Sequence, residues 1–259
     1  MDSRKKTMAR QGGWFNYPAR IFQDFLWVLG LSQIKLNFDD PGGRKKILVF
    51  MSDTGGGHKA SANAIVGALE ELYPNRFYCE IVDLWTDYGR FPFTLLVPHY
   101  QWAAKNTWGW WPVFYSGEHW LGRWVLATLQ YWTCGDRIRA LLQAFDPDMI
   151  VSVHPLCQNS AIRILKQLGG GKRQVPYMTV VTDLATGTAI WFNKEVDTFV
   201  VPGDEFEALA LQHGLRPEQI RKLGLPVRKG FWDATERRKN NKQMRAQLGI
   251  ENRPTVLVM

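Results

Sequence analysis

A glycine-rich turn that ends in a histidine is the part of the sequence best suited to chemistry. The stretch ILVFMSDTGGGHKASA, residues 47–62, runs from an apolar segment through Gly55–Gly57 to His58 and then into a helical pattern. Backbone N–H groups of such a turn lie at a helix N-terminus, where they can bind phosphate. The imidazole of His58 could take a proton from a hydroxyl beside that phosphate, because its unperturbed pKa is about 6.5. A histidine that caps the helix or lies in solvent would give the same pattern, so the loop alone leaves its role open.

The turn fits one nucleotide-binding pattern and fails another. A P-loop requires Gly-Lys-Ser/Thr, which the sequence GGGHKA does not supply. Gly55, Gly57 and Ala60 do fit the dinucleotide pattern G-x-G-x-x-A. Asp83, at the end of the next predicted strand, could then bind a ribose. An oxidoreductase of the NAD type is therefore one hypothesis for this chain.

Two more polar side chains follow predicted strands. His154 ends one strand and Asp183 ends another. The carboxyl ends of parallel strands meet at one edge of a sheet, so His154 would face the same crevice as His58. Asp183 could orient His58 or bind an acceptor hydroxyl. Both could equally be capping, packing or turn residues. No cluster of His, Asp or Glu has metal-ligand spacing, so no metal is predicted.

Apolar strands alternate with amphipathic helices along the chain, which favours an α/β fold with a parallel sheet. The strands are apolar on both faces, as expected when helices cover both sides of a sheet. The predicted strands span 46–51, 77–85, 148–155, 177–183 and 197–203. The predicted helices span 59–73, most of 95–145, 157–168, 204–213 and about 238–248, and a further strand begins in PTVLVM at 254–259.

Positive charge is concentrated at the two ends of the chain. The net charge is +5 over residues 1–46, −4 over 47–214 and +7 over 215–259. This distribution suits an anionic surface, either lipid or nucleic acid, although solvated charge would look the same. The sequence contains no secretory signal and no apolar run long enough to span a membrane. The segment 18–36 could lie flat on a membrane or pack against the sheet.

Tryptophan is concentrated in the middle of the chain. Eight of the 12 tryptophans lie within residues 85–132, and the segment NTWGWWPVFY (106–115) contains three of them in four positions. Tryptophan favours the lipid–water interface, because its ring is apolar and carries one polar group. We expect these residues to be exposed on a loop and to anchor the domain to a bilayer. The alternative is that they fill a core.

Five motifs, in order, resemble those of the monogalactosyldiacylglycerol synthases and of the related bacterial diacylglycerol glucosyltransferases. They are MSDTGGGHKASANAI, DLWTD, SVHPL, TVVTDLATGTAIWF and GLPVR. The resemblance covers roughly residues 46–259. DLWTD and TDLATGTAIWF look closer to the plant-type galactosyltransferases than to the bacterial enzymes. The resemblance therefore implies the chloroplast envelope as the location.

The resemblance implies a GT-B glycosyltransferase with two Rossmann-like domains. Residues 1–45 would form a basic extension and 46–228 the N-terminal acceptor-binding domain. Residues 229–259 would form a linker helix and the first strand of a truncated donor-binding domain. Because the donor loop would then lie beyond residue 259, we expect the 259-residue chain alone to be inactive and to bind UDP poorly.

The same resemblance implies a reaction and a set of site residues. Galactose would pass from UDP-galactose to the hydroxyl of diacylglycerol with inversion, without a metal or other cofactor. His58 would be the base, with Thr54 and Gly55, Gly56 and Gly57 beside the diphosphate. His154 and Asp183 would contribute to substrate binding.

Acceptor and anionic-lipid contacts would fall at Pro92 and Trp191. The sequence departs from the plant pattern near both residues. Arg90 precedes Pro92 where the plant-type loop is less basic, and TGTAIWF lacks the Cys-His-Pro that is typical of that stretch in the family. The identity of the activating lipid therefore stays open.

Several functions remain open from the sequence. A glucosyltransferase that uses UDP-glucose is the nearest alternative. An NAD-binding oxidoreductase and a non-catalytic membrane-binding domain belong to other classes. The expected partners are diacylglycerol, UDP-galactose and anionic membrane lipids at a peripheral membrane site. No nucleic acid is expected, and a homodimer remains open.

Overall fold

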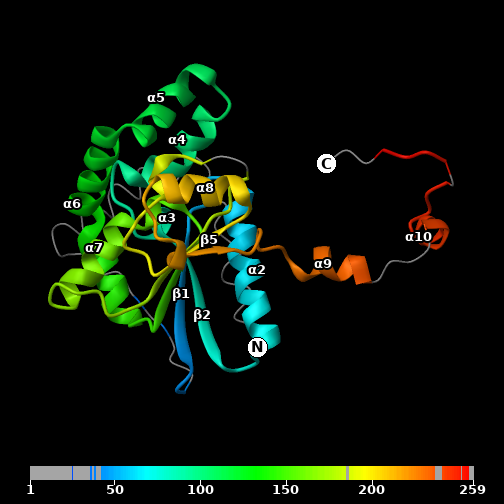
Figure 1. The fold of residues 1–259 in the computed structure, drawn as a ribbon, viewed down its shortest axis with the longest axis horizontal. Coiled ribbons are helices and arrows are strands. Elements are labelled where there is room, and N and C mark those ends of the chain that lie inside the picture. Colours follow the sequence, from blue (N-terminus) through cyan, green and yellow to red (C-terminus); the bar gives the residue numbers. More distant parts are fainter. Residues whose placement is uncertain are drawn as a thin grey trace.

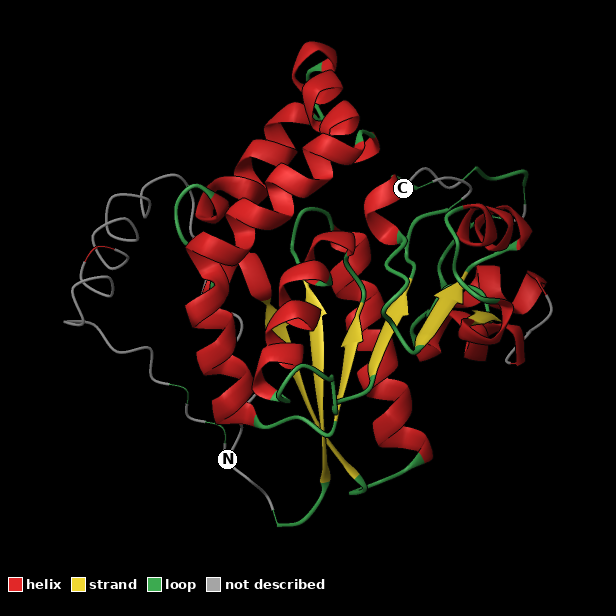
Figure 2. Ribbon diagram, turned by 60° about the vertical axis from the view of Figure 1, so that its left-hand side comes forward, coloured by secondary structure: helices red, strands yellow, loops and turns green. Residues whose placement is uncertain are grey.

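A six-stranded parallel sheet forms the centre of the protein (Figures 1 and 2). The computed structural model describes residues 42–184, 187–236, 241–251 and 253–256, together with Phe25, Leu36 and Phe38. The strand order is β2-β1-β3-β4-β5-β6, and every neighbouring pair is parallel. The strands are β1 (Lys45–Met51), β2 (Phe77–Asp83), β3 (Met149–Ser152), β4 (Tyr177–Val180), β5 (Thr198–Val201) and β6 (Ile220–Lys222).

Helices connect the strands and cover both faces of the sheet (Figure 2). The α-helices are α2 (Gly56–Leu72), α3 (Leu84–Asp87), α4 (Leu96–Ala103), α5 (Thr107–Glu118), α6 (Trp120–Phe145), α7 (Asn159–Leu168), α8 (Asp204–Gln212), α9 (Lys229–Glu236) and α10 (Asn241–Gln247). Short 3-10 turns are η3 (Phe93–Leu95), η4 (Pro155–Cys157), η5 (Ala189–Trp191) and η6 (Pro217–Gln219).

Two apolar clusters form the core, one on each side of the sheet. Alternation along β1 sends Leu48 and Phe50 into the larger cluster, which also receives side chains from α6, α7 and α8. Ile47 and Val49 point the other way, into a smaller cluster beneath α2. Successive side chains on a strand point to opposite faces, so the unbroken apolar run of β1 fits a strand covered on both sides.

The sequence prediction of an α/β parallel sheet is confirmed, and so are all five predicted strands. The short strand β6 was not predicted, because only Ile220 of its three residues is buried and no apolar pattern marks it. Helix α2 begins at Gly56, three residues earlier than the apolar pattern indicates. The predicted helix over 18–36 falls outside the described residues except for Phe25 and Leu36.

The predictions for the C-terminal part were less accurate. Helix α10 matches the described part of the helix predicted over 238–248, whereas α9 was not predicted. The strand predicted from Pro254 is wrong for residues 254–256, which are not in a strand, and 257–259 lie outside the described residues. Figure 1 shows α9 and α10 extending away from the sheet, and no described strand pairs with residues 254–256.

The strand order places a topological switch point between β1 and β3. The chain goes from β1 outward to the edge strand β2, and then returns to β3 on the other side of β1. In open α/β sheets, ligands bind outside the carboxyl ends of the strands at such a point. His58 follows β1 and His154 follows β3, so both histidines lie at this position.

Helix α6 offers a test of the core. Leu141 is fully buried against the sheet, whereas Leu129 on the same helix is 47% exposed. Leu141→Ala should lower the free energy of unfolding by about 2–5 kcal/mol, because it removes a buried side chain and leaves a cavity. Leu129→Ala is the matched control. Urea unfolding followed by circular dichroism would measure both, and equal losses for the two variants would contradict the described packing.

Candidate functional site

The imidazole of His58 is held by atoms from the ends of two other strands. His58 lies in the first turn of α2, after β1. Its Nδ1 atom is 2.9 Å from the carbonyl oxygen of Val153, just after β3. The same Nδ1 is 2.7 Å from Oγ1 of Thr182, just after β4. The imidazole of His58 is therefore held in place by the segments that follow β1, β3 and β4.

These contacts determine which nitrogen of His58 carries the proton. The Val153 carbonyl can only accept a hydrogen bond, so Nδ1 must be the N–H that donates to it. In the neutral ring, Nε2 then carries the lone pair. Nε2 makes no hydrogen bond to any residue that the structure describes. The arrangement leaves the basic atom of His58 available to an acceptor hydroxyl.

The surroundings keep this ring neutral near pH 7. Burial lowers the pKa of His58 below its ordinary value, and the negative charge of Asp183 and the Val153 hydrogen bond offset part of that effect. A neutral imidazole is the form that can accept a proton. The lowered pKa therefore agrees with a neutral His58 ring whose Nε2 carries the lone pair.

His154 is a buried neighbour of His58. The two rings meet edge to face with centroids 4.7 Å apart. Nδ1 of His154 accepts from the Leu156 N–H at 3.3 Å, so its Nε2 carries the proton and donates to Oγ1 of Thr54, also at 3.3 Å. Complete burial holds the pKa of His154 well below its ordinary range, and the nearby His58 lowers it further. Both ring nitrogens serve internal contacts, which makes His154 a support for Thr54 and His58.

The glycine-rich turn presents bare backbone at the start of α2. Gly55 is the N-cap residue and provides no side-chain cap, and the first turn of α2 contains no acidic residue. A Cβ atom added at Gly55, Gly56 or Gly57 would meet nothing within 4 Å. The three glycines are exposed, so the start of α2 is open to a ligand. A helix N-terminus of this kind favours a bound anion such as a diphosphate.

Asp183 and Trp191 lie against the same site. The indole N–H of Trp191 donates to a carboxylate oxygen of Asp183 at 2.7 Å, and the Trp191 ring centroid is 6.3 Å from that of His58. Trp191 is fully buried. Orientation of His58 by hydrogen bonding falls to Val153 and Thr182, while Asp183 acts on the ring through its charge.

The structure thus brings together eight residues that the sequence singled out and places one elsewhere. Those together are Thr54, the glycine turn, His58, His154 and the Asp183–Trp191 pair. Pro92 lies in an exposed turn before η3, where its carbonyl accepts from the N–H of Leu95. Sequence reasoning missed Thr182 and Val153, although the strand-end position of TVVTD was a usable signal for Thr182.

Asp83 does not have the free carboxylate that the NAD hypothesis requires. It is 8% exposed. One of its oxygens accepts from the backbone N–H of Asp53 at 3.2 Å, and the other accepts from that of Thr86 at 3.1 Å, capping α3. Both oxygens therefore hold the chain in place, which weighs against a role in binding a cofactor ribose.

The tryptophan-rich segment is helical, so the expectation of a loop was wrong. It forms α4, α5 and the first part of α6, of which α4 and α5 lie beyond the end of the sheet (Figure 1). Two glycines of α5 permit close packing. A Cβ atom at Gly109 would lie 2.7 Å from the ring of Trp102, and one at Gly117 would lie 3.0 Å from Ile190 of η5.

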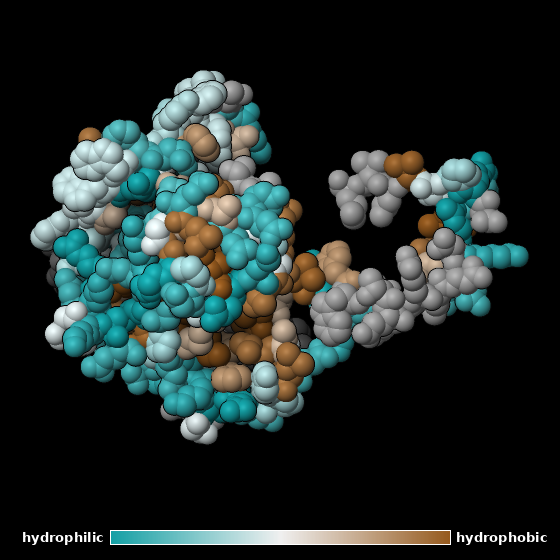
Figure 3. Space-filling view, in the orientation of Figure 1, coloured by the Kyte–Doolittle hydropathy of each residue, from teal (hydrophilic) through white to brown (hydrophobic). Residues whose placement is uncertain are grey.

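Most of these tryptophans are nevertheless on the surface. Trp85 is fully buried, in agreement with the alternative that some fill the core. The exposed ones are Trp102, Trp108, Trp111, Trp120, Trp124 and Trp132. In Figure 3 the α4–α5 end of the molecule shows pale atoms of intermediate hydropathy among the teal ones. We call the six exposed tryptophans the aromatic face.

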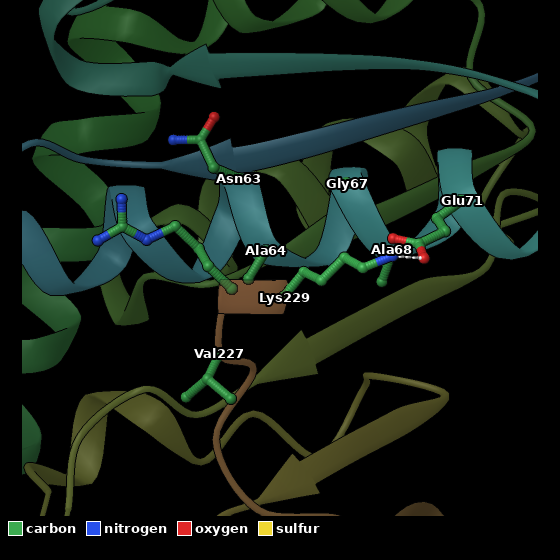
Figure 4. Close-up of a pocket in the computed structure, with 8 residues that line it drawn as sticks. Asn63, Ala64, Gly67, Ala68, Glu71, Val227 and Lys229 are labelled. Atoms are coloured by element: carbon green, nitrogen blue, oxygen red, sulfur yellow. Dashed lines mark hydrogen bonds and ion pairs between the residues drawn. The ribbon is translucent and has the colours of Figure 1, made fainter. Parts of the chain in front are cut away.

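A small hollow lies between α2 and the chain that leads from β6 to α9 (Figure 4). Small residues of α2 form one wall, and Val227, Arg228 and Lys229 form the other. Lys229 makes an ion pair with Glu71 near the end of α2. The helix that carries His58 in its first turn thus also contacts the start of the C-terminal segment.

In the part of the chain that the structure describes, no helix combines the length and apolar character needed to cross a bilayer. No group of three or more His, Cys, Asp or Glu side chains is placed to hold a metal ion among the same residues.

The domain is Rossmann-like, in agreement with the GT-B fold class. A family model described as monogalactosyldiacylglycerol (MGDG) synthase matches residues 58–227, and the chain belongs to that family.

Curated plant proteins show the same relationship. The chain is 36% identical over 234 residues to the chloroplastic MGDG synthase of Spinacia oleracea, covering 90% of this chain and 44% of the spinach protein. It is 36% identical to MGDG synthase 1 of Arabidopsis thaliana, over 90% of this chain and 43% of that protein. It is 37% identical to MGDG synthase 3 of the same plant, over 83% and 46%. The chain spans less than half the length of these relatives.

The buried histidines predict a loss of stability in mild acid. The folded-state pKa values of His58 and His154 lie below the ordinary value near 6.5. As pH falls below about 6.5, the unfolded chain binds protons that the folded chain does not. Each histidine should then lower the free energy of unfolding by up to about 1.4 kcal/mol per pH unit.

Urea unfolding between pH 7.5 and 5 would measure this slope. His154→Gln should reduce the slope, because it removes one of the two groups. His119→Gln, which removes an exposed imidazole between α5 and α6, is the control. An identical slope in wild type and His154→Gln would contradict the account of His154 as a buried neutral ring.

Proposed function

We propose that this chain carries the base and the acceptor side of an MGDG synthase. The reaction would be the inverting transfer of galactose from UDP-galactose to the free hydroxyl of 1,2-diacylglycerol. Membership of the MGDG synthase family supports the substrates. The observation that carries the proposal is the lone pair on Nε2 of His58, which no described residue engages, beside the uncapped N-terminus of α2.

The proposed step follows from that geometry. Nε2 of His58 takes the proton of the acceptor hydroxyl as its oxygen attacks the anomeric carbon of galactose. The bond from that carbon to the β-phosphate oxygen breaks, and the electron pair leaves with UDP. One displacement inverts the anomeric centre. The N–H groups at the start of α2 stabilise the charge that develops on the diphosphate.

The remaining residues have supporting roles in this proposal. His154 keeps the Thr54 hydroxyl in place beside the glycine turn. Asp183, with its charge near His58, stabilises the imidazolium that forms after proton transfer. Trp191 holds Asp183 by its indole hydrogen bond, and its buried ring lies beside His58. Pro92 would contact the acceptor or an anionic lipid from its exposed turn.

The aromatic face supports a peripheral position on a membrane. Its indoles are large and amphipathic, as interfacial anchors are. Diacylglycerol is confined to a bilayer, so the base has to be brought to a membrane surface. Because the curated relatives are named as chloroplastic, we propose the chloroplast envelope as that membrane.

Removal of the imidazole tests the catalytic proposal. His58→Ala in the native gene product should lower turnover by roughly 10²–10⁴-fold, the usual contribution of a general base. The assay would follow transfer from radiolabelled UDP-galactose to diacylglycerol in mixed micelles, with UDP-glucose run in parallel. His213→Gln, which changes the C-cap residue of α8, is the control for loss of a histidine. Near-normal turnover of a folded His58→Ala protein would exclude His58 as the base.

The two donors also separate the competing functions. Faster transfer from UDP-glucose would replace the proposal with a diacylglycerol glucosyltransferase. No transfer from either donor, with vesicle binding retained, would favour a non-catalytic membrane-binding domain.

Vesicle binding tests the membrane proposal. Replacing Trp120, Trp124 and Trp132 of α6 together by Ser should weaken binding to vesicles of phosphatidylglycerol and phosphatidylcholine by at least about tenfold, because three interfacial anchors are lost. Binding by wild type should also weaken as salt rises, because the Debye length falls to about 3 Å at 1 M.

Leu72→Ser with Leu223→Ser is the matched control, since both leucines are exposed outside the aromatic face. Sedimentation with vesicles would measure each protein. Equal losses in the two sets of variants would show that exposed apolar area in general, and not the aromatic face, binds the membrane.

A further inference from the structure

Thr182 completes a closed set of hydrogen bonds around His58. Its Oγ1 atom lies 2.7 Å from Nδ1 of His58 and 3.1 Å from the carbonyl oxygen of Val153. The carbonyl also receives Nδ1 at 2.9 Å. The three atoms therefore form a triangle in which every edge is of hydrogen-bond length.

Only one arrangement of protons satisfies the triangle. The Val153 oxygen has no proton to give, so the Thr182 hydroxyl donates to it. With that single proton committed, Oγ1 of Thr182 faces Nδ1 with its lone pairs and accepts from Nδ1–H. The opposite choice, in which Thr182 donates to Nδ1, would leave two lone pairs facing each other 2.9 Å apart between His58 and Val153.

We propose that Thr182 is a positioning residue for His58, which locks the imidazole in the tautomer with its lone pair on Nε2 and stabilises the ring when that atom takes a proton. This inference rests on the proposed role of His58 as base. It adds a role for a hydroxyl that lies behind the ring, on the side away from the basic atom.

The physical basis is the difference between a neutral and a charged donor. A hydrogen bond from imidazolium is about twice as strong as one from neutral imidazole. The Thr182 acceptor therefore stabilises the product of proton transfer more than the reactant. Removing it should make His58 a weaker base and should also free the ring to adopt the other tautomer.

Other groups facing the ring act by charge or by contact. Asp183 lies beyond β4 and raises the pKa of His58. His154 lies after β3 and is neutral. Asp53 and Lys59, at the start of α2, form an ion pair with each other at 3.1 Å. The Thr182 hydroxyl contacts only Nδ1 of His58 and the Val153 carbonyl among the described residues, so Thr182→Val removes these two hydrogen bonds without changing a charged group.

The first experiment reads the ring directly and needs no transferase activity. Two-bond ¹H–¹⁵N spectra of the ¹⁵N-histidine-labelled chain, with His58→Gln to assign the signal, report tautomer and pKa. Wild-type His58 should show protonated Nδ1 and unprotonated Nε2. Thr182→Val should lower the pKa of His58 by roughly one unit and populate the other tautomer. Thr182→Ser, which keeps the hydroxyl, should stay close to wild type.

The second experiment reads the function. In the galactose-transfer assay, Thr182→Val should lower kcat roughly tenfold, with KM for UDP-galactose little changed. The acid limb of the plot of kcat against pH should move to lower pH by roughly one pH unit, as the pKa of His58 does. Thr198→Val controls for the loss of a half-buried threonine, because Thr198 begins β5 and so lies at the amino ends of the strands, whereas the site lies at their carboxyl ends.

The outcomes separate this inference from the proposed function. An unshifted pKa and tautomer in folded Thr182→Val would overturn the role of Thr182, whatever the activity. If Thr182→Val shows the shifted pKa and tautomer but the wild-type protein transfers no sugar, the positioning role is retained and the proposed reaction is rejected. If Thr182→Val does not fold, the wild-type spectrum decides alone, since protonated Nε2 on His58 contradicts the triangle.

Discussion

The hydrogen bond from Nδ1 of His58 to the Val153 carbonyl is the interaction on which the site depends. It joins the first turn of α2 to the end of β3 and forces the lone pair of the ring onto Nε2. The bond can form only because β1 and β3 are neighbours in the sheet, with the chain between them diverted through β2. The strand order, which is a property of the whole domain, therefore sets the protonation pattern of one side chain.

The aromatic face is physically connected to the same site. Helix α5 packs closely on η5 at Gly117, and Glu118 at its end accepts from the backbone N–H of Ala189. Two residues further on, Trp191 holds Asp183, whose charge acts on His58. The segment that would meet the membrane and the segment that carries the base are thus joined by packing and hydrogen bonds and not by chain connectivity alone.

The sequence predicted the sheet well because buried parallel strands leave a strong apolar pattern. It also placed His154 and Asp183 after strands, and His58 in the turn between a strand and a helix. It failed where the deciding information is three-dimensional. The segment 106–115 was expected to form a loop, yet Gly109 lies in a helix and allows it to approach Trp102. Thr182 was not chosen, because a hydroxyl gains its role only from two atoms that are far away in sequence.

A crystal structure with UDP and a short-chain diacylglycerol bound to the native gene product would test the central claim most directly. The account predicts the free acceptor hydroxyl about 2.6–3.2 Å from Nε2 of His58, the range for proton transfer, with the diphosphate against the N–H groups of Gly55–Gly57. An acceptor hydroxyl held by another residue, or a diphosphate bound away from the start of α2, would contradict it.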